Sequence, residues 1–252
     1  MAGNDRDFVG ALEKGLLVIE SFDQTHAKQT LSDVARRTGM TRAAARRYLL
    51  TLARIGYAES NGKLFWLVPR VLRLGYALLA TTPLPKLAQP ILDRIGERTH
   101  EIVTIAIREG EGVIFLAHSS SRRIISAATG VGFRIPLYCS AAGKVILASQ
   151  SDAEIKRFLT DREFPQLTPQ TKTTFDDLWT EIMKVRADGF AISDEEFELG
   201  LRSIAVAVPD SRGQVAVAIA VSLHAGRMTV AELIHNVLPE LQAGRQDLVS
   251  ML

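Results

Sequence analysis

The chain has 252 residues and a mass of 27.6 kDa, too long for one small module and comfortable for two domains. Hydrophobic residues make up 47% of the chain, and no apolar run approaches the roughly 18 residues of a membrane span, so we expect no membrane partner. The N-terminal segment has no secretory signal pattern, which predicts a cytoplasmic protein. The single cysteine, Cys139, excludes an internal disulfide and a four-thiolate zinc site, and we expect no cofactor or metal.

Positive charge is concentrated at the start of the chain. Residues 1–80 hold 12 Lys and Arg against 7 Asp and Glu, a net charge of +5, whereas the remainder holds 18 against 21, a net charge of −3. The two parts meet at the Thr-Thr-Pro-Leu-Pro stretch of residues 81–85, which interrupts a helical pattern. Such asymmetry suggests a nucleic-acid-binding region on a neutral body, with a solvated basic surface as the alternative.

The first part of the chain predicts three helices and a hairpin. Apolar residues recur at helical spacing through 8–22, and a second helix begins at Thr30, which has an acidic residue three positions later, and ends at Gly39. The chain is helical again over 41–55. The dipeptide Asn61-Gly62 then favours a two-residue hairpin turn. We therefore predict a winged helix-turn-helix domain over residues 1–68.

The third helix carries the argument for DNA binding. Four arginines and no acidic residue lie between Arg42 and Arg54. Thr41 caps the helix, but the third residue after it is not acidic, unlike in three other predicted helices of the chain. The free amides at this end can bind a phosphate, and the arginines can reach guanine edges or phosphates in the major groove of double-stranded operator DNA. A solvated basic helix is the alternative. The predicted DNA-contacting residues are Thr41, Arg42, Ala43, Arg46, Arg47 and Lys63.

A linker helix follows, which we place at residues 69–84 with its helical pattern running from Pro69 to about Ala80. Its apolar residues fit a dimer contact or packing on its own winged domain, and both interpretations stay open. A further helix over 86–99 is expected to be kinked or restarted at Pro90.

Residues 85–252 are predicted to form an α+β domain on an antiparallel sheet, built for sensing a ligand and for oligomerisation. The expected strands are 101–107, 113–119, 124–127, 134–137, 191–193, 202–209 and 215–223. The expected helices are 141–149, 152–159, 175–186 and a last helix that runs from Thr229 to the C-terminus with Pro239 inside it.

The sequence offers no support for catalysis, so we expect no enzyme. The segment from Cys139 to Lys144 lacks the first glycine and the final hydroxyl of a phosphate-binding loop, and no GxSxG or HExxH motif is present. Cys139 fits an activated thiol or, more simply, a buried packing residue. The acidic run at 194–198 fits a divalent ion or, more simply, a solvated loop.

A pocket for a small carboxylate is predicted where a strand passes into a helix. Tyr138, Cys139 and Ser140 occupy this junction, and the helix start has free amides, with Arg134 and Lys144 nearby in sequence. Two further serines lie on otherwise apolar strands, where each hydroxyl is either satisfied by the backbone or turned into a cavity. They are Ser203 and Ser222.

Four ordered segments of the chain resemble the isocitrate-lyase-regulator (IclR) family of bacterial transcriptional regulators. They are LSDVARRTGMTRAAARRYLLTLARIGY (31–57), PRVLRLGYALL (69–79), RIPLYCSAAGKVILA (134–148) and SDEEFELGLRSIAVAVPDSRGQVAVAIAVS (193–222). The resemblance implies a winged-helix domain, a linker helix and a GAF-like effector domain, in dimers or tetramers that regulate catabolic operons. It is greatest to the branch that responds to protocatechuate, para-hydroxybenzoate or β-ketoadipate.

Carried over by position, the resemblance implies an effector site at the junction named above, at Ser193 and Asp194, and at the two strand serines. Ala220 stands where some relatives have a pocket serine, and Ser193 where some have an aspartate. Lys144 stands where the aromatic branch often has arginine. A constitutive regulator whose second domain binds no ligand and only oligomerises is the remaining alternative.

Overall fold

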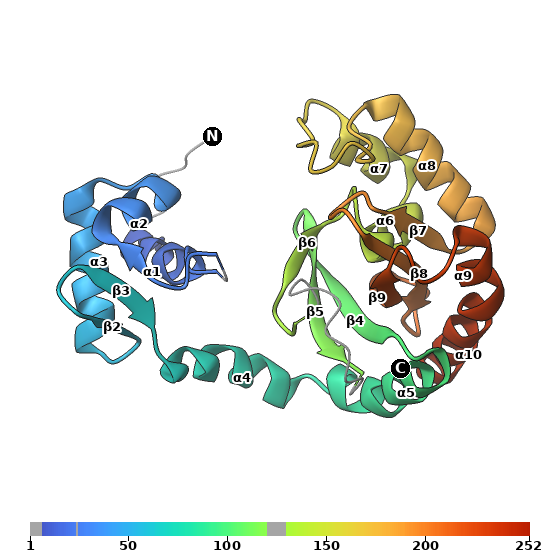
Figure 1. Ribbon diagram of the computed structural model, residues 1–252, viewed down its shortest axis with the longest axis horizontal. Helices are drawn as coiled ribbons and strands as arrows, with labels where there is room; N and C mark the ends of the chain where they lie inside the picture. Colours follow the sequence, from blue (N-terminus) through green and yellow to red (C-terminus); the bar gives the residue numbers. More distant parts are fainter. Residues whose placement is uncertain (1–6, 24, 120–129) are drawn as a thin grey trace. The chain divides into compact units, whose positions relative to one another are not determined.

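The computed structural model describes residues 7–23, 25–119 and 130–252, and the strand predicted at 124–127 lies outside these ranges. The chain forms two compact units, residues 1–81 and 82–252 (Figure 1). The observed bounds of the predicted helices and strands of the second unit agree with the sequence to within two residues, except in the last helix.

The first unit is a winged helix-turn-helix, as predicted. Its three helices pack their apolar faces on a small core that includes Val18, Val34, Leu49 and Phe65. The helices are α1 (Gly10–Glu20), α2 (Leu31–Thr38) and α3 (Arg42–Arg54), followed by the short helix η1 (Pro69–Val71) and α4 (Leu72–Thr81). The strands are β1 (Gln29–Thr30), β2 (Ala58–Ser60) and β3 (Leu64–Leu67), in the order β1-β3-β2.

Helix α2 begins and ends at the residues that the sequence indicated, Thr30 and Gly39. The Thr30 hydroxyl accepts a hydrogen bond from the Asp33 amide at 3.2 Å, and the Asp33 carboxylate accepts one from the Thr30 amide at 3.1 Å. This reciprocal cap satisfies two amides that the helix itself cannot use. Gly39 ends the helix with φ of 66°, a left-handed conformation that glycine adopts without steric cost.

The wing differs from its prediction in two respects. The predicted two-residue turn is wrong in detail, because Gly62 alone of the Asn61-Gly62 pair takes positive φ, at 92°. Instead the side-chain oxygen of Asn61 accepts hydrogen bonds from the Lys63 and Leu64 amides at 3.1 and 2.9 Å, which stabilises a longer turn. Strand β1, which the sequence analysis missed, pairs with β3 and is only two residues long.

The second unit is built on one antiparallel sheet in the order β6-β5-β4-β9-β8-β7. Its strands are β4 (Ile102–Glu109), β5 (Gly112–His118), β6 (Arg134–Pro136), β7 (Ala191–Asp194), β8 (Leu201–Pro209) and β9 (Val215–His224). Its helices are α5 (Leu84–Thr99), α6 (Ala141–Ala148), α7 (Asp152–Leu159), α8 (Phe175–Asp188), α9 (Val230–Asn236) and α10 (Leu238–Val249). This confirms the predicted α+β class.

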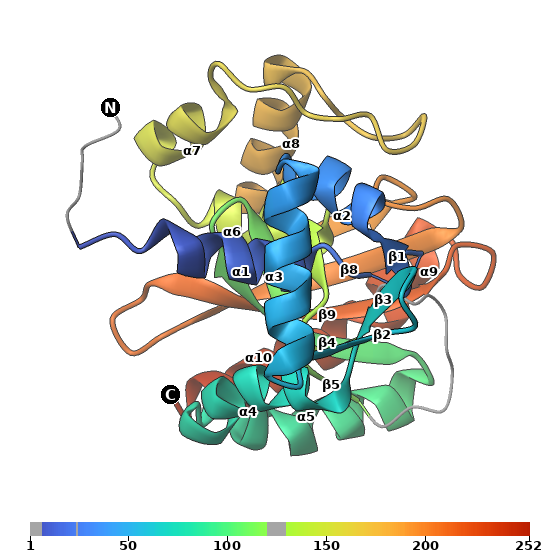
Figure 2. The same ribbon diagram turned by 90° about the vertical axis from the view of Figure 1, so that its left-hand side faces the viewer.

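Helices cover both faces of this sheet. Figures 1 and 2 show α6 and α8 on one face and α5 and α10 on the other. Each face has its own core. Small strand residues such as Ala205 and Ala218 lie beneath α6 and α8, whereas large ones such as Ile204 and Ile219 pack on α5 and α10. The small residues leave room between α6 and the sheet, and this is the face that carries the pocket described below.

The prediction of one uninterrupted C-terminal helix is wrong. The segment forms α9 and α10, which are separated at Val237, and Pro239 lies in the first turn of α10. Proline is tolerated there because the amide it lacks would have no helical partner. The expected restart at Pro90 is also wrong, since α5 continues through this exposed residue.

The close packing of α6 gives a first prediction. A Cβ atom on Gly143 would lie 2.3 Å from the carbonyl oxygen of Leu137, a distance that the rigid backbone cannot relieve cheaply. Gly143→Ala should therefore lower the free energy of unfolding by at least about 2 kcal/mol, measured by urea unfolding. Gly75→Ala is the matched control, because a Cβ there meets no atom within 4 Å and alanine favours the helix by about 0.5–1 kcal/mol. Equal unfolding midpoints for the two variants would contradict this account.

Candidate DNA-binding and effector-binding sites

The start of α3 presents an exposed and positively charged surface. The Thr41 hydroxyl accepts a hydrogen bond from the Ala44 amide at 3.2 Å, and the first turn contains no acidic residue. The helix therefore keeps the positive end of its dipole for an external anion. Ala45, Leu49 and Leu52 face the core, which turns the arginines to the opposite side. The five predicted contacts on α3 and its cap, Thr41, Arg42, Ala43, Arg46 and Arg47, are all exposed.

The arginines of α2 and α3 differ in their partners. On α2, Arg36 pairs with Asp33 at 2.8 Å, and Arg37 pairs with Asp23. On α3, Arg46 and Arg47 form no ion pair within the described part of the chain. Unpaired guanidinium groups on an exposed face are available to phosphates and base edges without first breaking an internal contact.

Two of the predicted DNA contacts, Arg42 and Lys63, differ in what holds their side chains. The Arg42 guanidinium donates a hydrogen bond to the Ser32 hydroxyl of α2, which fixes its side chain across the turn between the two helices. Lys63 is exposed at the turn of the wing. The predicted contacts thus lie at the start of α3 and at the tip of the wing.

A pocket lies between the start of α6 and the sheet of the second unit. Its cavity volume is about 20 Å³, room for about one water molecule. Its lining includes four of the predicted effector residues, Ser140, Ser193, Ser203 and Ser222. Its apolar walls, which the sequence analysis missed, include Phe115, Ile135, Phe197 and Leu201. Phe197 could have been suspected from the sequence, because it is an aromatic residue inside the acidic run at 194–198.

The four serines keep part of their hydrogen-bonding capacity free. Ser140 donates to the Pro136 carbonyl at 2.8 Å and caps α6 through the Gly143 amide at 3.1 Å. Ser193 donates to the carbonyl of Cys139 at 2.7 Å. The hydroxyls of Ser203 and Ser222 lie 3.0 Å apart. One hydroxyl proton suffices for that bond, so the second proton of the pair remains available to a ligand.

Two other predicted effector residues lie at the rims of the sheet and do not line this pocket. Arg134 is exposed on β6 and pairs with Glu109 at 2.8 Å. Asp194 ends β7 and pairs with Arg202 at 2.7 Å. Each charge is therefore paired with a residue of another strand in this structure.

Tyr138 and Cys139 shape the segment that leads into α6 and also lie outside the pocket lining. The Tyr138 hydroxyl donates to the Pro165 carbonyl at 2.6 Å, and burial raises the pKa of this side chain to about 12. Cys139 is fully buried. Its burial first, and the nearby charge of Glu196 second, raise the pKa of its thiol to about 12. The thiol is thus protonated at neutral pH, which is the opposite of an activated nucleophile.

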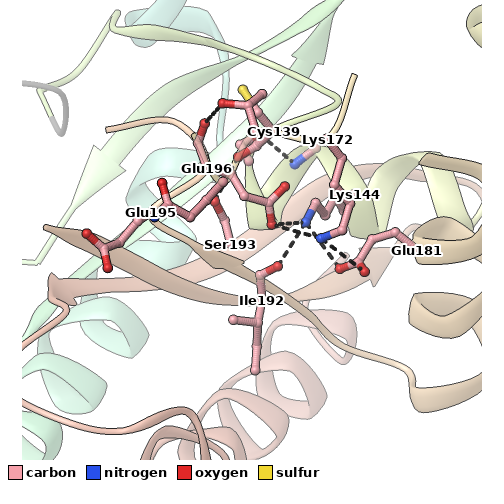
Figure 3. A network of polar contacts seen from close by, with 12 residues as sticks. Cys139, Lys144, Lys172, Glu181, Ile192, Ser193, Glu195 and Glu196 are labelled. Carbon is pink, nitrogen blue, oxygen red and sulfur yellow. Dashed lines mark hydrogen bonds and ion pairs between the residues drawn. The ribbon is translucent and has the colours of Figure 1, made fainter. Parts of the chain in front are cut away.

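Lys144 is buried in an ionic network and is not available to a ligand in the pocket (Figure 3). Its side chain is 1% exposed, and its Nζ atom lies 2.5 Å from Glu196, 3.2 Å from Glu181 and 3.1 Å from the Ile192 carbonyl. Lys172 approaches the same two carboxylates at 3.4 and 3.5 Å. The expectation of a solvated acidic loop is therefore wrong for Glu196. One Glu196 oxygen, Oε2, has no hydrogen-bond partner among the described residues.

The two lysines of the network lower the pKa of Glu181. Burial acts to raise the pKa of Glu181, but the charges of Lys144 and Lys172 outweigh it and hold the pKa below the usual value for glutamate. Elsewhere in the described ranges, no group of three or more His, Cys, Asp or Glu side chains is placed to hold a metal ion.

A winged helix-turn-helix joined to an α+β unit with a serine-lined pocket is an architecture typical of a ligand-responsive transcription factor. The description "IclR helix-turn-helix domain" matches residues 11–62, and "Bacterial transcriptional regulator IclR C-terminal" matches residues 76–249. The chain belongs to the IclR family of bacterial transcriptional regulators, as its sequence resemblance implied.

Individual relatives cover most of the chain. The Pca regulon regulatory protein of Pseudomonas putida is 41% identical over 98% of this chain and 86% of its own length. The crystal structure of a transcriptional regulator from Rhodococcus has a TM-score of 0.81 at 38% identity and covers 96% of this chain and 98% of its own. A double mutant of the inducer-binding domain of the PobR transcription factor from Acinetobacter, in complex with 3-hydroxybenzoic acid, has a TM-score of 0.64 at 26% identity. That match covers 67% of this chain and 99% of the domain.

These relatives are regulators and not enzymes, in agreement with the expectation for this chain. In the described ranges, none of the helices combines the length and the apolar character that a membrane span requires.

The ionic network gives a second prediction. Lys144→Met keeps the side-chain volume but leaves the buried Glu196 without its nearest cation, so it should lower the free energy of unfolding by about 3–5 kcal/mol in urea. Because the pKa of Glu181 is depressed in the folded state, the stability that its charge contributes is present above the usual glutamate pKa and is lost as the pH falls. The deficit of the variant should therefore shrink in acid.

The double variant Lys144→Met with Glu196→Gln is the control for this prediction. It removes the uncompensated charge together with its partner and should recover part of the lost stability. Additive effects of the two single substitutions would contradict the proposed pairing.

Proposed function

We propose that the protein regulates genes of aromatic-acid catabolism, and that a small carboxylate effector in the pocket beside α6 sets its affinity for operator DNA. The observation that carries this proposal is that each unit has a helix whose first turn contains no acidic residue, α3 in the first unit and α6 in the second. The start of α3 is exposed beside unpaired arginines, and that of α6 opens into a pocket lined by serines. The first suits the phosphates of DNA, and the second suits the carboxylate of a small molecule.

For DNA we infer that α3 enters the major groove. Thr41 and the amides that follow it bind a backbone phosphate, while Arg42, Arg46 and Arg47 reach base edges or phosphates. Ala43 is small and exposed, so the helix can approach the bases closely. Lys63 at the wing contacts the neighbouring backbone. Double-stranded operator DNA is the partner that these positions fit.

For the effector we infer that its carboxylate lies at the start of α6. The first turn of this helix has no acidic residue, and Ala141 and Ala142 line the pocket. The ring or carbon chain then packs against Phe115 and Phe197, and these walls move apart to admit it, because the cavity volume is only about 20 Å³. The name of the P. putida relative and the hydroxybenzoate in the PobR complex support an aromatic acid. Protocatechuate, para-hydroxybenzoate and β-ketoadipate are the compounds to test.

The eight predicted effector residues divide into two roles in this proposal. Ser140, Ser193, Ser203 and Ser222 contact the ligand, since they line the pocket. Tyr138 and Cys139 position the segment that carries Ser140, and the ion pairs of Arg134 and Asp194 brace the two edges of the sheet.

We further propose that the protein acts in the cytoplasm as a homodimer or tetramer. Paired winged domains read two half-sites of an operator, and the first unit exposes large apolar residues that fit contact with a second copy. They include Leu12 on α1 and Leu72 and Tyr76 on α4. Effector binding changes the placement of the paired winged domains through α4, with a coupling of about 1–3 kcal/mol.

A third prediction tests the DNA contacts. Arg46→Ala should weaken binding to the specific operator by about 1–3 kcal/mol if Arg46 reads a base, with a smaller loss on unrelated DNA. Fluorescence anisotropy at fixed salt measures both affinities. Arg54→Ala, at the other end of the same helix, controls for general loss of charge. An equal loss on all sequences would make Arg46 a phosphate contact, and no loss would remove it from the interface.

A fourth prediction tests the effector. A thermal-shift screen against protocatechuate, para-hydroxybenzoate, β-ketoadipate, muconate and glyoxylate should give stabilisation by one aromatic acid or its ring-cleavage product. At about 100 times its Kd such a ligand stabilises the fold by roughly 2.7 kcal/mol. The double variant Ser203→Ala with Ser222→Ala should reduce the shift. Silence toward every compound would favour the regulator that binds no ligand, and identical operator affinity with and without a bound effector would exclude the proposed coupling.

A further inference from the structure

Strand β4 adjoins the effector pocket but has contributed none of the effector residues considered so far. The pocket is lined by Phe115 on β5 and by Ala220 and Ser222 on β9. Strand β4 lies between β5 and β9 in the sheet, so its residues on this face adjoin the pocket lining. Thr104 of β4 stands directly opposite Ala220 of β9. Since side chains of opposite residues in an antiparallel pair share one face, Thr104 lies on the pocket side of the sheet, next to Ala220 of the lining.

The hydroxyl of Thr104 is buried and unused. The residue is 0% exposed, and its Oγ1 atom has no hydrogen-bond partner among the described residues. Within the described ranges it is the single buried hydroxyl in this condition. Buried hydroxyls are normally paired, because desolvation without a partner costs stability. The pocket serines follow that rule, so the unpaired Thr104 points to a partner that arrives with the ligand.

The surroundings of Thr104 define the chemistry of that partner. Its neighbours on this face are the small apolar side chains of Ala106 and Ala220 and, opposite it on β5, the side chain of His118. No lysine or arginine is among the described residues that line the pocket, so a carboxylate near Thr104 would lack such a cation. A neutral hydroxyl group, which both donates and accepts, suits the position.

We propose that Thr104 binds the second polar group of the effector, the ring hydroxyl of a hydroxybenzoate whose carboxylate lies at the start of α6. This inference rests on the effector role proposed for the pocket. Thr104 then acts as a specificity residue that distinguishes hydroxylated from unsubstituted aromatic acids. A site that hydrogen-bonds a ligand hydroxyl discriminates against analogues without it, because its own polar group is then left unpaired.

Titration of the full-length protein with 4-hydroxybenzoate and with benzoate tests the proposal. Thr104→Val is nearly isosteric and removes only the hydroxyl. We expect it to weaken 4-hydroxybenzoate binding about five- to tenfold, the effect of one neutral hydrogen bond, and to change benzoate binding less than about twofold. The melting temperature of the ligand-free variant should be equal to or above that of the wild type, because an unpaired buried hydroxyl is lost.

Thr99→Val is the matched control. Thr99 is also buried in the second unit, but its hydroxyl donates to the Ile95 carbonyl at 2.8 Å within α5, on the opposite face of the sheet. It should leave both affinities unchanged.

The other outcomes separate the two proposals. Unchanged 4-hydroxybenzoate binding in Thr104→Val, an equal loss for both acids, or a lower melting temperature without ligand would each overturn the role of Thr104 and leave the effector pocket standing. A wild-type protein that binds neither aromatic acid also overturns it. Only the absence of a thermal shift with every carboxylate of the fourth prediction would contradict the effector function itself.

Discussion

The second unit depends on one backbone contact, in which α6 lies against Leu137 at a distance that only Gly143 permits. This contact fixes the helix across the small-residue face of the sheet. Three features of the unit follow from it. The first turn of α6 opens into the pocket, the Ser140 hydroxyl caps that turn, and Lys144 is directed into the buried network with Glu196. A larger residue at this one position would displace the ligand site and the network together.

The two units share one device for binding anions. Helices α2, α7 and α9 begin with a hydroxyl cap and an acidic residue that bond to each other reciprocally, which neutralises the helix start internally. Helices α3 and α6 have the hydroxyl cap but no acidic residue in the first turn. One start is exposed beside arginines and the other lies at an apolar pocket. In the proposed function, the same local chemistry serves a polyanion in one place and a small acid in the other.

Local signals made much of this structure predictable. Caps at Thr30 and Thr41, and the glycine turn at Gly39, fixed helix ends correctly because they act within a few residues. The last helix was misread because a first-turn proline and an interior proline look alike in sequence. Features that depend on contacts between residues far apart in the sequence could not be predicted. The partners of Lys144 come from α8 and from the segment after β7, and the position of Thr104 follows from the register between β4 and β9. In the site, the four serines could be predicted, whereas the aromatic walls could not.

The burial of Cys139 has a consequence for the conditions under which the regulator works. Oxidants react with the thiolate, and a thiol whose pKa is raised to about 12 is almost entirely protonated in a cell. The chain has no second cysteine with which to form a disulfide. Cys139 is therefore a poor target for oxidants, and the chain cannot respond to them by forming an internal disulfide.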